Sequence, residues 1–137
     1  MRNTVKSFGV LAAAVMLSSA ATGTAWADIP FDQPITGNAT YYTDVGYGAC
    51  GTQIDASAQL LAAAPAAYWT TANPNNDPLC QGVSVQVSYN GRSITVPVVD
   101  KCPSCDSTHV DLSAPAFSRL ADTGLGTIPV TWSFVRS

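Results

Sequence analysis

Four cysteines restrict the possible folds of this 137-residue chain more than any other feature: Cys50, Cys80, Cys102 and Cys105. How they are used depends on the compartment in which the protein lies. Residues 1–27 carry a positively charged start, a short apolar run and an Ala-Trp-Ala site, in the order typical of a secretory signal peptide. We therefore expect cleavage after residue 27 and export to an oxidising, extracellular environment.

An even number of cysteines in an exported protein favours two disulfides, for which three connectivities are possible. We favour Cys50–Cys80, because this bond closes a long loop and constrains the unfolded chain most. The second bond is then Cys102–Cys105, which clamps the tight turn at Pro103-Ser104.

Two alternatives remain for the Cys102-x-x-Cys105 motif. Zinc could be bound by both cysteines and His109, with Asp100 or Asp111 as the fourth ligand. A thioredoxin-like redox role needs a βαβ frame around the motif, and the sequence shows none. Because thiolates are unusual in an exported protein, we expect neither a metal nor a cofactor.

The charge of the mature chain argues against several classes of partner. It has four basic residues and nine aspartates, which gives a net charge of about −5 at neutral pH. Such a surface repels phosphate backbones and anionic lipids, so we expect neither nucleic acid nor a membrane as partner. The length fits one compact domain, and we expect a monomer.

The start of the mature chain differs from the rest. Residues 28–36 contain two prolines and few apolar anchors, which predicts a flexible N-terminal arm before a domain at 37–137. Gln33 would then be accessible to modification by an extracellular transglutaminase. This role is a hypothesis that rests on accessibility alone.

The remaining pattern is mostly that of β-strands. Apolar and polar residues alternate over Val83–Tyr89 and again over Ile94–Val98, and Asn90-Gly91 between them predicts a type I′ hairpin. A last strand alternates over Ile128–Phe134, and Ser113 is a suitable cap for a short helix that would end near Asp122. An all-β domain of this size hides its strand edges in a closed barrel or a sandwich.

Four segments, taken in order, resemble the double-psi β-barrel group: NATYYTDVGYGACG, NGRSITVPVVDKCPSC, HVDLSAPAFSRLA and IPVTWSF. This group includes expansin N-terminal domains, barwin-like domains, family 45 endoglucanases and rare lipoprotein A. The resemblance implies a six-stranded double-psi barrel with one or two short helices and two disulfides. It also implies that Gln59–Trp69 forms a strand leading into a helical turn, which propensity alone left ambiguous.

Within the group, the small secreted form with the PNNDPLC loop is similar to a Streptomyces branch that inhibits papain. The resemblance implies a secreted actinobacterial protein that reversibly blocks the cleft of papain-like cysteine proteases, with other extracellular proteases as further expected partners. A stiff polar loop and the glycine-rich turn beside it are the expected inhibitory surface, with these residues in contact: Tyr47, Tyr68, Trp69, Asn73 and Pro74.

The alternative function is chemistry on cell-wall glycans. Asp111 matches the functional aspartate of expansins and rare lipoprotein A, and Asp44 matches the second carboxylate of family 45 endoglucanases. Two carboxylates across a groove could act as general acid and base. If the protein is an inhibitor, we expect no catalytic residue.

Overall fold

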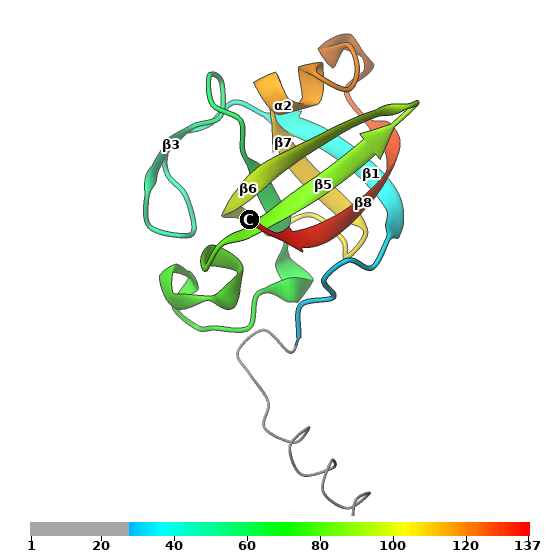
Figure 1. Ribbon diagram of the computed structural model, residues 1–137. Coiled ribbons are helices and arrows are strands. Elements are labelled where there is room, and N and C mark those ends of the chain that lie inside the picture. The colour runs from blue at the N-terminus through cyan, green and yellow to red at the C-terminus, as the bar shows by residue number, and fades with distance from the viewer. Residues whose placement is uncertain (1–27) are drawn as a thin grey trace, which may run out of the picture.

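The computed structural model describes residues 28–137, so the expected signal peptide at 1–27 lies outside the described residues. A closed barrel contains six strands in the spatial order β1-β7-β4-β6-β5-β8 (Figure 1). Their bounds are β1 Ile35–Tyr42, β4 Ala62–Pro65, β5 Val83–Tyr89, β6 Arg92–Cys102, β7 His109–Ser113 and β8 Ile128–Arg136. The expected all-β, six-stranded barrel is therefore confirmed.

The other elements are short. Strands β2 (Val45–Tyr47) and β3 (Gln53–Asp55) form a separate hairpin outside the barrel. Residues 28–137 also form one α-helix and four single 3₁₀ turns: α2 Ala114–Ser118, η1 Ala66–Tyr68, η2 Pro74–Asn76, η3 Pro78–Cys80 and η4 Thr123–Leu125. No helix among residues 28–137 is long and apolar enough to cross a membrane.

Local sequence signals explain several elements. Asn90 and Gly91 both have positive φ, 49° and 84°, as a type I′ turn requires, and β5 pairs with β6 on either side of them. Ser113 caps α2 by accepting a hydrogen bond from the Ala116 amide at 3.3 Å. The helix ends at Ser118, earlier than expected. The segment 59–69 is a strand followed by a 3₁₀ turn, as the family resemblance implied.

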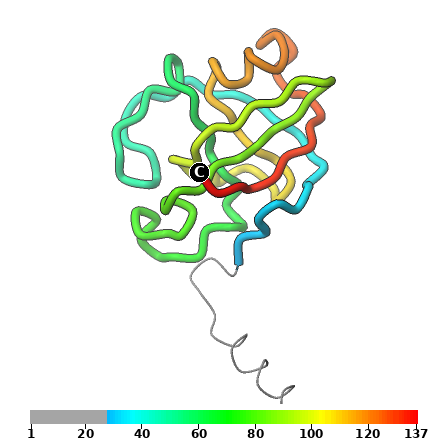
Figure 2. The backbone as a smooth tube through the Cα atoms, viewed as in Figure 1, coloured from blue at the N-terminus to red at the C-terminus, as the bar shows by residue number. Residues whose placement is uncertain are grey.

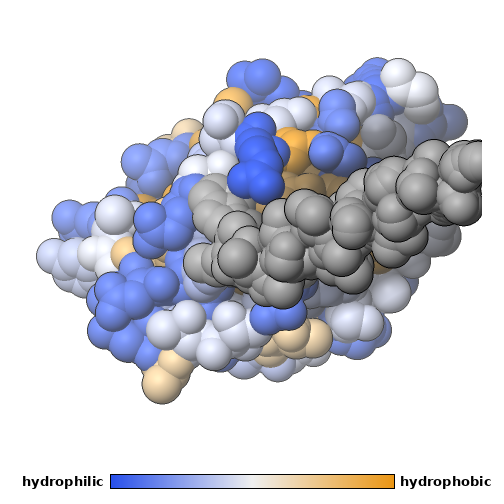
Figure 3. Space-filling view, turned by 60° about the horizontal axis from the view of Figure 1, so that its bottom comes forward, coloured by the Kyte–Doolittle hydropathy of each residue, from blue (hydrophilic) through white to orange (hydrophobic). Residues whose placement is uncertain are grey.

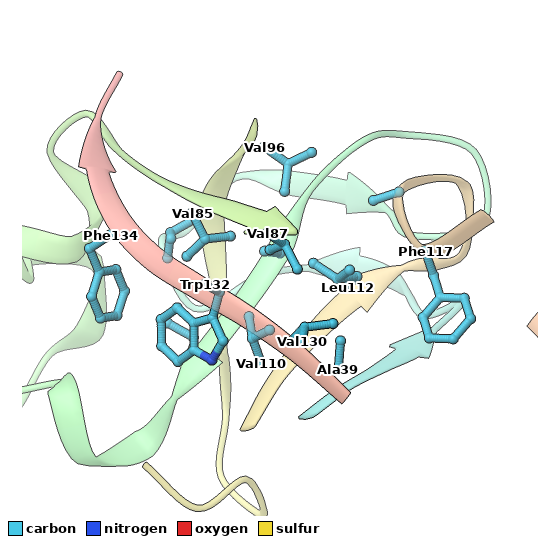
Figure 4. Close-up of a cluster of buried hydrophobic side chains, with 14 of the residues drawn as sticks. Ala39, Val85, Val87, Val96, Val110, Leu112, Phe117, Val130, Trp132 and Phe134 are labelled. Carbon is cyan, nitrogen blue, oxygen red and sulfur yellow. The ribbon is translucent and has the colours of Figure 1, made fainter. Parts of the chain in front are cut away.

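The barrel core is apolar and aromatic (Figure 4). Trp132 and Phe134 pack edge to face with ring centroids 5.1 Å apart, and both are almost fully buried. The buried indole of Trp132 donates its N–H to the Thr108 carbonyl at 2.9 Å. Outside the core, the face seen in Figure 3 is largely polar, with apolar residues in small patches.

The segment 28–36 corrects the expectation of a free arm. Ile29 is only 7% exposed and belongs to the main core cluster. Phe31 forms a parallel β-bridge with Phe134, and the Arg136 guanidinium lies 4.2 Å from the Phe31 ring centroid. These contacts hold the segment against the barrel, so the prolines shape a packed segment rather than a detached one.

Ile29→Ala tests this anchoring. Removing most of a buried isoleucine side chain should lower the free energy of unfolding by about 2–4 kcal/mol, measured by urea denaturation. Gln33→Ala is the matched control, because Gln33 is exposed in the same segment and should change stability by less than about 0.5 kcal/mol. Equal stability of the two variants would mean that the segment does not contribute to the fold.

Candidate functional site

A polar network connects β1 with β7, which pair in parallel with Thr40 opposite Asp111. The Thr40 hydroxyl donates to Asp111 Oδ1 at 2.9 Å and lies 2.7 Å from His109 Nε2. Because the hydroxyl has a single proton, the second contact requires Nε2 of His109 to be protonated. Burial raises the pKa of the Asp111 carboxyl, although the Thr40 hydrogen bond and His109 oppose this effect.

Tyr42 contacts one aspartate directly and senses the charge of two others. Its hydroxyl donates to Asp100 Oδ2 at 2.9 Å, while Asp100 Oδ1 accepts the amide of Ala49 at 2.9 Å. Burial and then the negative charge of Asp100 raise the pKa of Tyr42, and Asp111 and Asp44 act in the same direction. Asp100 therefore contacts the phenol directly, and Asp111 and Asp44 lie near enough for their charge to act on it.

Asp44 and Asp111 therefore lie in one region, as the glycan hypothesis requires, but in unlike environments. Asp44 is exposed at the end of β1, and its carbonyl accepts the Ala56 amide at 2.8 Å. Asp111 is half buried and hydrogen-bonded. Burial biases the Asp111 carboxyl towards its protonated form.

The motif Cys102-x-x-Cys105 is a covalent clasp. Cys102 and Cys105 are joined by a disulfide and pack with Ala63 against Tyr42. Because neither sulfur is a thiolate, the zinc alternative with His109 loses two of its ligands. The other expected disulfide, between Cys50 and Cys80, is also present, and no cysteine among the described residues is free.

The β2–β3 hairpin carries the most exposed large apolar side chains among the described residues. Val45 is 69% exposed and Tyr47 is 79% exposed, and their positions two residues apart put them on one face of β2. Gly48 follows directly, where a Cβ would lie 2.6 Å from the Val99 carbonyl oxygen. Glycine is thus needed there for the hairpin to lie close to the barrel.

The loop between η1 and β5 is built around a buried carboxylate. Asp77 is 1% exposed, and its two oxygens accept the amides of Thr70, Thr71 and Leu79 at 2.8–3.0 Å. Asn73 caps η2 in a similar way by accepting the Asn75 amide. The loop is therefore fixed by hydrogen bonds to its own backbone.

Two aromatic residues connect this loop to the core. The Trp69 indole donates to the Ala64 carbonyl at 3.2 Å, and the Tyr68 hydroxyl donates to the Ser107 carbonyl at 2.9 Å. Both rings are partly buried against the main core cluster. This arrangement favours support of the loop over direct contact with a partner for Tyr68 and Trp69.

The hairpin and the loop lie side by side (Figure 2). The Cys50–Cys80 disulfide joins the end of the hairpin to η3, and a Cβ on Gly51 would lie 2.8 Å from the Asn75 side chain. The η2 turn that begins with half-buried Pro74 thus lies beside the end of the hairpin, three residues after exposed Tyr47.

Comparison with known proteins identifies the family. Residues 35–132 match the double-psi β-barrel family described as lytic transglycolase. The chain belongs to this family. Papain inhibitor from Streptomyces mobaraensis is 65% identical over 127 residues, which cover 92% of this chain and 89% of the inhibitor.

Solved structures give the same relationship. Streptomyces papain inhibitor matches with a TM-score of 0.78 and 68% identity, over 79% of this chain and 99% of the inhibitor. The expansin of Clavibacter michiganensis matches with a TM-score of 0.61 and 25% identity, over 77% of this chain and 52% of the expansin. Within the double-psi family, this protein is therefore a homologue of the papain inhibitors and a more distant relative of expansins.

Sequence reasoning missed two residues of this region. Val45 shares the exposed face of β2 with Tyr47, but three-residue strands leave too little alternation to detect. Asp77 precedes Pro78, and an aspartate before a proline is a recognisable start for a helical turn. That signal predicts the cap but not its burial, which depends on the whole loop.

Asp77→Ala should lower the free energy of unfolding by about 2–4 kcal/mol, because it removes the shared acceptor of three backbone amides. Asp122→Ala is the control: Asp122 caps η4 in the same manner but is exposed, so about 1 kcal/mol or less should be lost. Urea denaturation of both variants gives the comparison. Similar losses would mean that burial adds nothing to the role of Asp77.

Proposed function

We propose that this protein is an exported, reversible inhibitor that blocks the active-site cleft of papain-like cysteine proteases. The observation that carries the proposal is the similarity to Streptomyces papain inhibitors along most of the length of both proteins. Other extracellular proteases with a comparable cleft are further candidate targets. Because no cysteine is free among residues 28–137, a covalent bond to the protease thiol would require one disulfide to open.

The inhibitory contact that we propose is the exposed face of β2, with the η2 turn beside it. Val45 and Tyr47 expose apolar surface that contributes nothing to the core, and such surface commonly marks a binding site. Asn73 and Pro74 would form the rim of this contact. A hairpin held by a disulfide and a close glycine contact loses little conformational freedom when it enters a cleft.

Tyr47→Ala tests both the function and the surface. The wild-type protein should inhibit papain in a steady-state assay, and the variant should bind at least about fivefold more weakly, or about 1 kcal/mol, at an unchanged melting temperature. Leu125→Ala is the control, because Leu125 is 58% exposed on η4 and should keep full inhibition. No inhibition by the wild type would refute the function, whereas equal inhibition by both variants would refute only the surface.

A second candidate function is binding or cleavage of cell-wall glycans through Asp111. The observation that favours it is the half-buried Asp111 carboxyl, whose raised pKa suits a proton donor, close to the exposed Asp44. Inhibition remains the preferred function, because the expansin likeness is lower in identity and covers about half of the expansin.

Asp111→Asn separates the two functions. The amide oxygen can still accept the Thr40 hydrogen bond, so papain inhibition should be unchanged if the protein is an inhibitor alone. Because burial disfavours the charged carboxyl, its ionisation reduces stability above its pKa, and the neutral variant should melt at least as high as wild type at pH 7. Release of sugar from peptidoglycan or cellulose by wild type, lost in the variant, would instead establish the glycan function.

Export and modification complete the proposal. The signal-peptide pattern at 1–27 and the two disulfides both support an extracellular location. Gln33 is exposed although its neighbours are anchored, which supports it as a site for an extracellular transglutaminase.

A further inference from the structure

One strand of the barrel extends well beyond its neighbour. Strand β6 has eleven residues, but β4 has four and pairs with it only from Val98 onwards. The preceding part of β6, residues 92–97, pairs with β5 on one side (Figure 1). Within the described part of the chain, no strand pairs with its other side. The closed barrel therefore retains one open strand edge.

The register identifies the backbone groups on that edge. A two-residue turn makes Tyr89 and Arg92 a hydrogen-bonded pair. From Arg92 onwards, the backbone N–H and C=O groups of every second residue of β6 therefore point to β5. The backbone N–H and C=O groups of Ser93 and Thr95 point away from β5, towards the open edge. Pro97 offers only a carbonyl there. The open edge thus presents two amides and their carbonyls in the spacing of an unpaired strand.

A cavity of about 430 Å³ lies along this edge. It is lined by residues 92–96 of β6 together with Leu60 and Arg119. Arg92 and Arg119 are two of only four basic residues in the mature chain, and no carboxylate lines the cavity. In a protein with an excess of aspartate, this is a local concentration of positive charge.

We propose that this groove binds an acidic peptide segment in extended conformation. The segment would add to the edge of β6 as a further strand, with its backbone hydrogen-bonded to Ser93 and Thr95. Its carboxylates would pair with the guanidinium groups of Arg92 and Arg119, whose fork of donors suits a carboxylate. This surface is separate from the β2 face proposed for protease inhibition.

Charge selection is tested with two labelled octapeptides, one of alternating glutamate and valine and one of alternating glutamine and valine. Fluorescence anisotropy should show binding of the acidic peptide and at least tenfold weaker binding of the neutral one. Arg92→Gln and Arg119→Gln should each weaken the acidic complex at least fivefold. Arg136→Gln removes the same charge at the end of β8 and should leave binding within twofold. Equal binding of both peptides, or equal loss in all three variants, would overturn the proposal.

Strand addition is tested through the backbone. Amide hydrogen exchange by NMR should slow at least tenfold for Ser93 and Thr95 when the acidic peptide saturates the protein. Thr95→Pro removes one edge N–H that β5 does not use, and it should weaken the peptide complex at least fivefold. The exchange measurement uses wild-type protein and so remains decisive if the proline variant does not fold. Unchanged exchange at both amides would refute strand addition.

Discussion

The Cys50–Cys80 disulfide is the constraint on which the proposed inhibitory surface depends. It joins two segments that lie outside the barrel, the β2–β3 hairpin and the loop that ends at η3. Strands of three residues are too short to be stable as an isolated hairpin in water. The covalent bond holds the end of the hairpin, and the close approach of Gly48 to Val99 seats it on the barrel. The hairpin therefore keeps its shape without burying its large side chains.

This division of roles explains why Val45 and Tyr47 can remain in solvent while Tyr68 and Trp69 cannot. Tyr68 and Trp69 connect the neighbouring loop to the core through their rings and through one hydrogen bond each. Asp77 then fixes the loop backbone from inside. The residues that hold the shape of the loop are thus distinct from the exposed residues that we propose as the contact with a partner. Such a division would lower the entropic cost of binding.

Local signals in the sequence predicted the local structure well. Asn90-Gly91 predicted the hairpin and Ser113 predicted the helix cap. Loop length favoured, among three possible connectivities, the two disulfides that are present. The features that the sequence did not predict depend on contacts between residues far apart in the chain. Ile29 lies in a segment rich in proline, yet it is buried because the barrel end offers an apolar surface to it. The parallel pairing of β1 with β7, which brings Thr40 to Asp111, joins strands about seventy residues apart, so local patterns in the sequence could not predict it.

The open edge of β6 follows from the unequal lengths of β4 and β6, and it would be a liability in a secreted protein. An exposed edge can pair with the same edge of a second copy. Here Pro97 withholds an amide, and Arg92 and Arg119 would face the like charges of the other copy across a symmetric pairing. The same arginines attract a carboxylate-bearing strand. Protection against self-association and selection of an acidic partner therefore have one physical origin, the positive charge placed beside unpaired backbone.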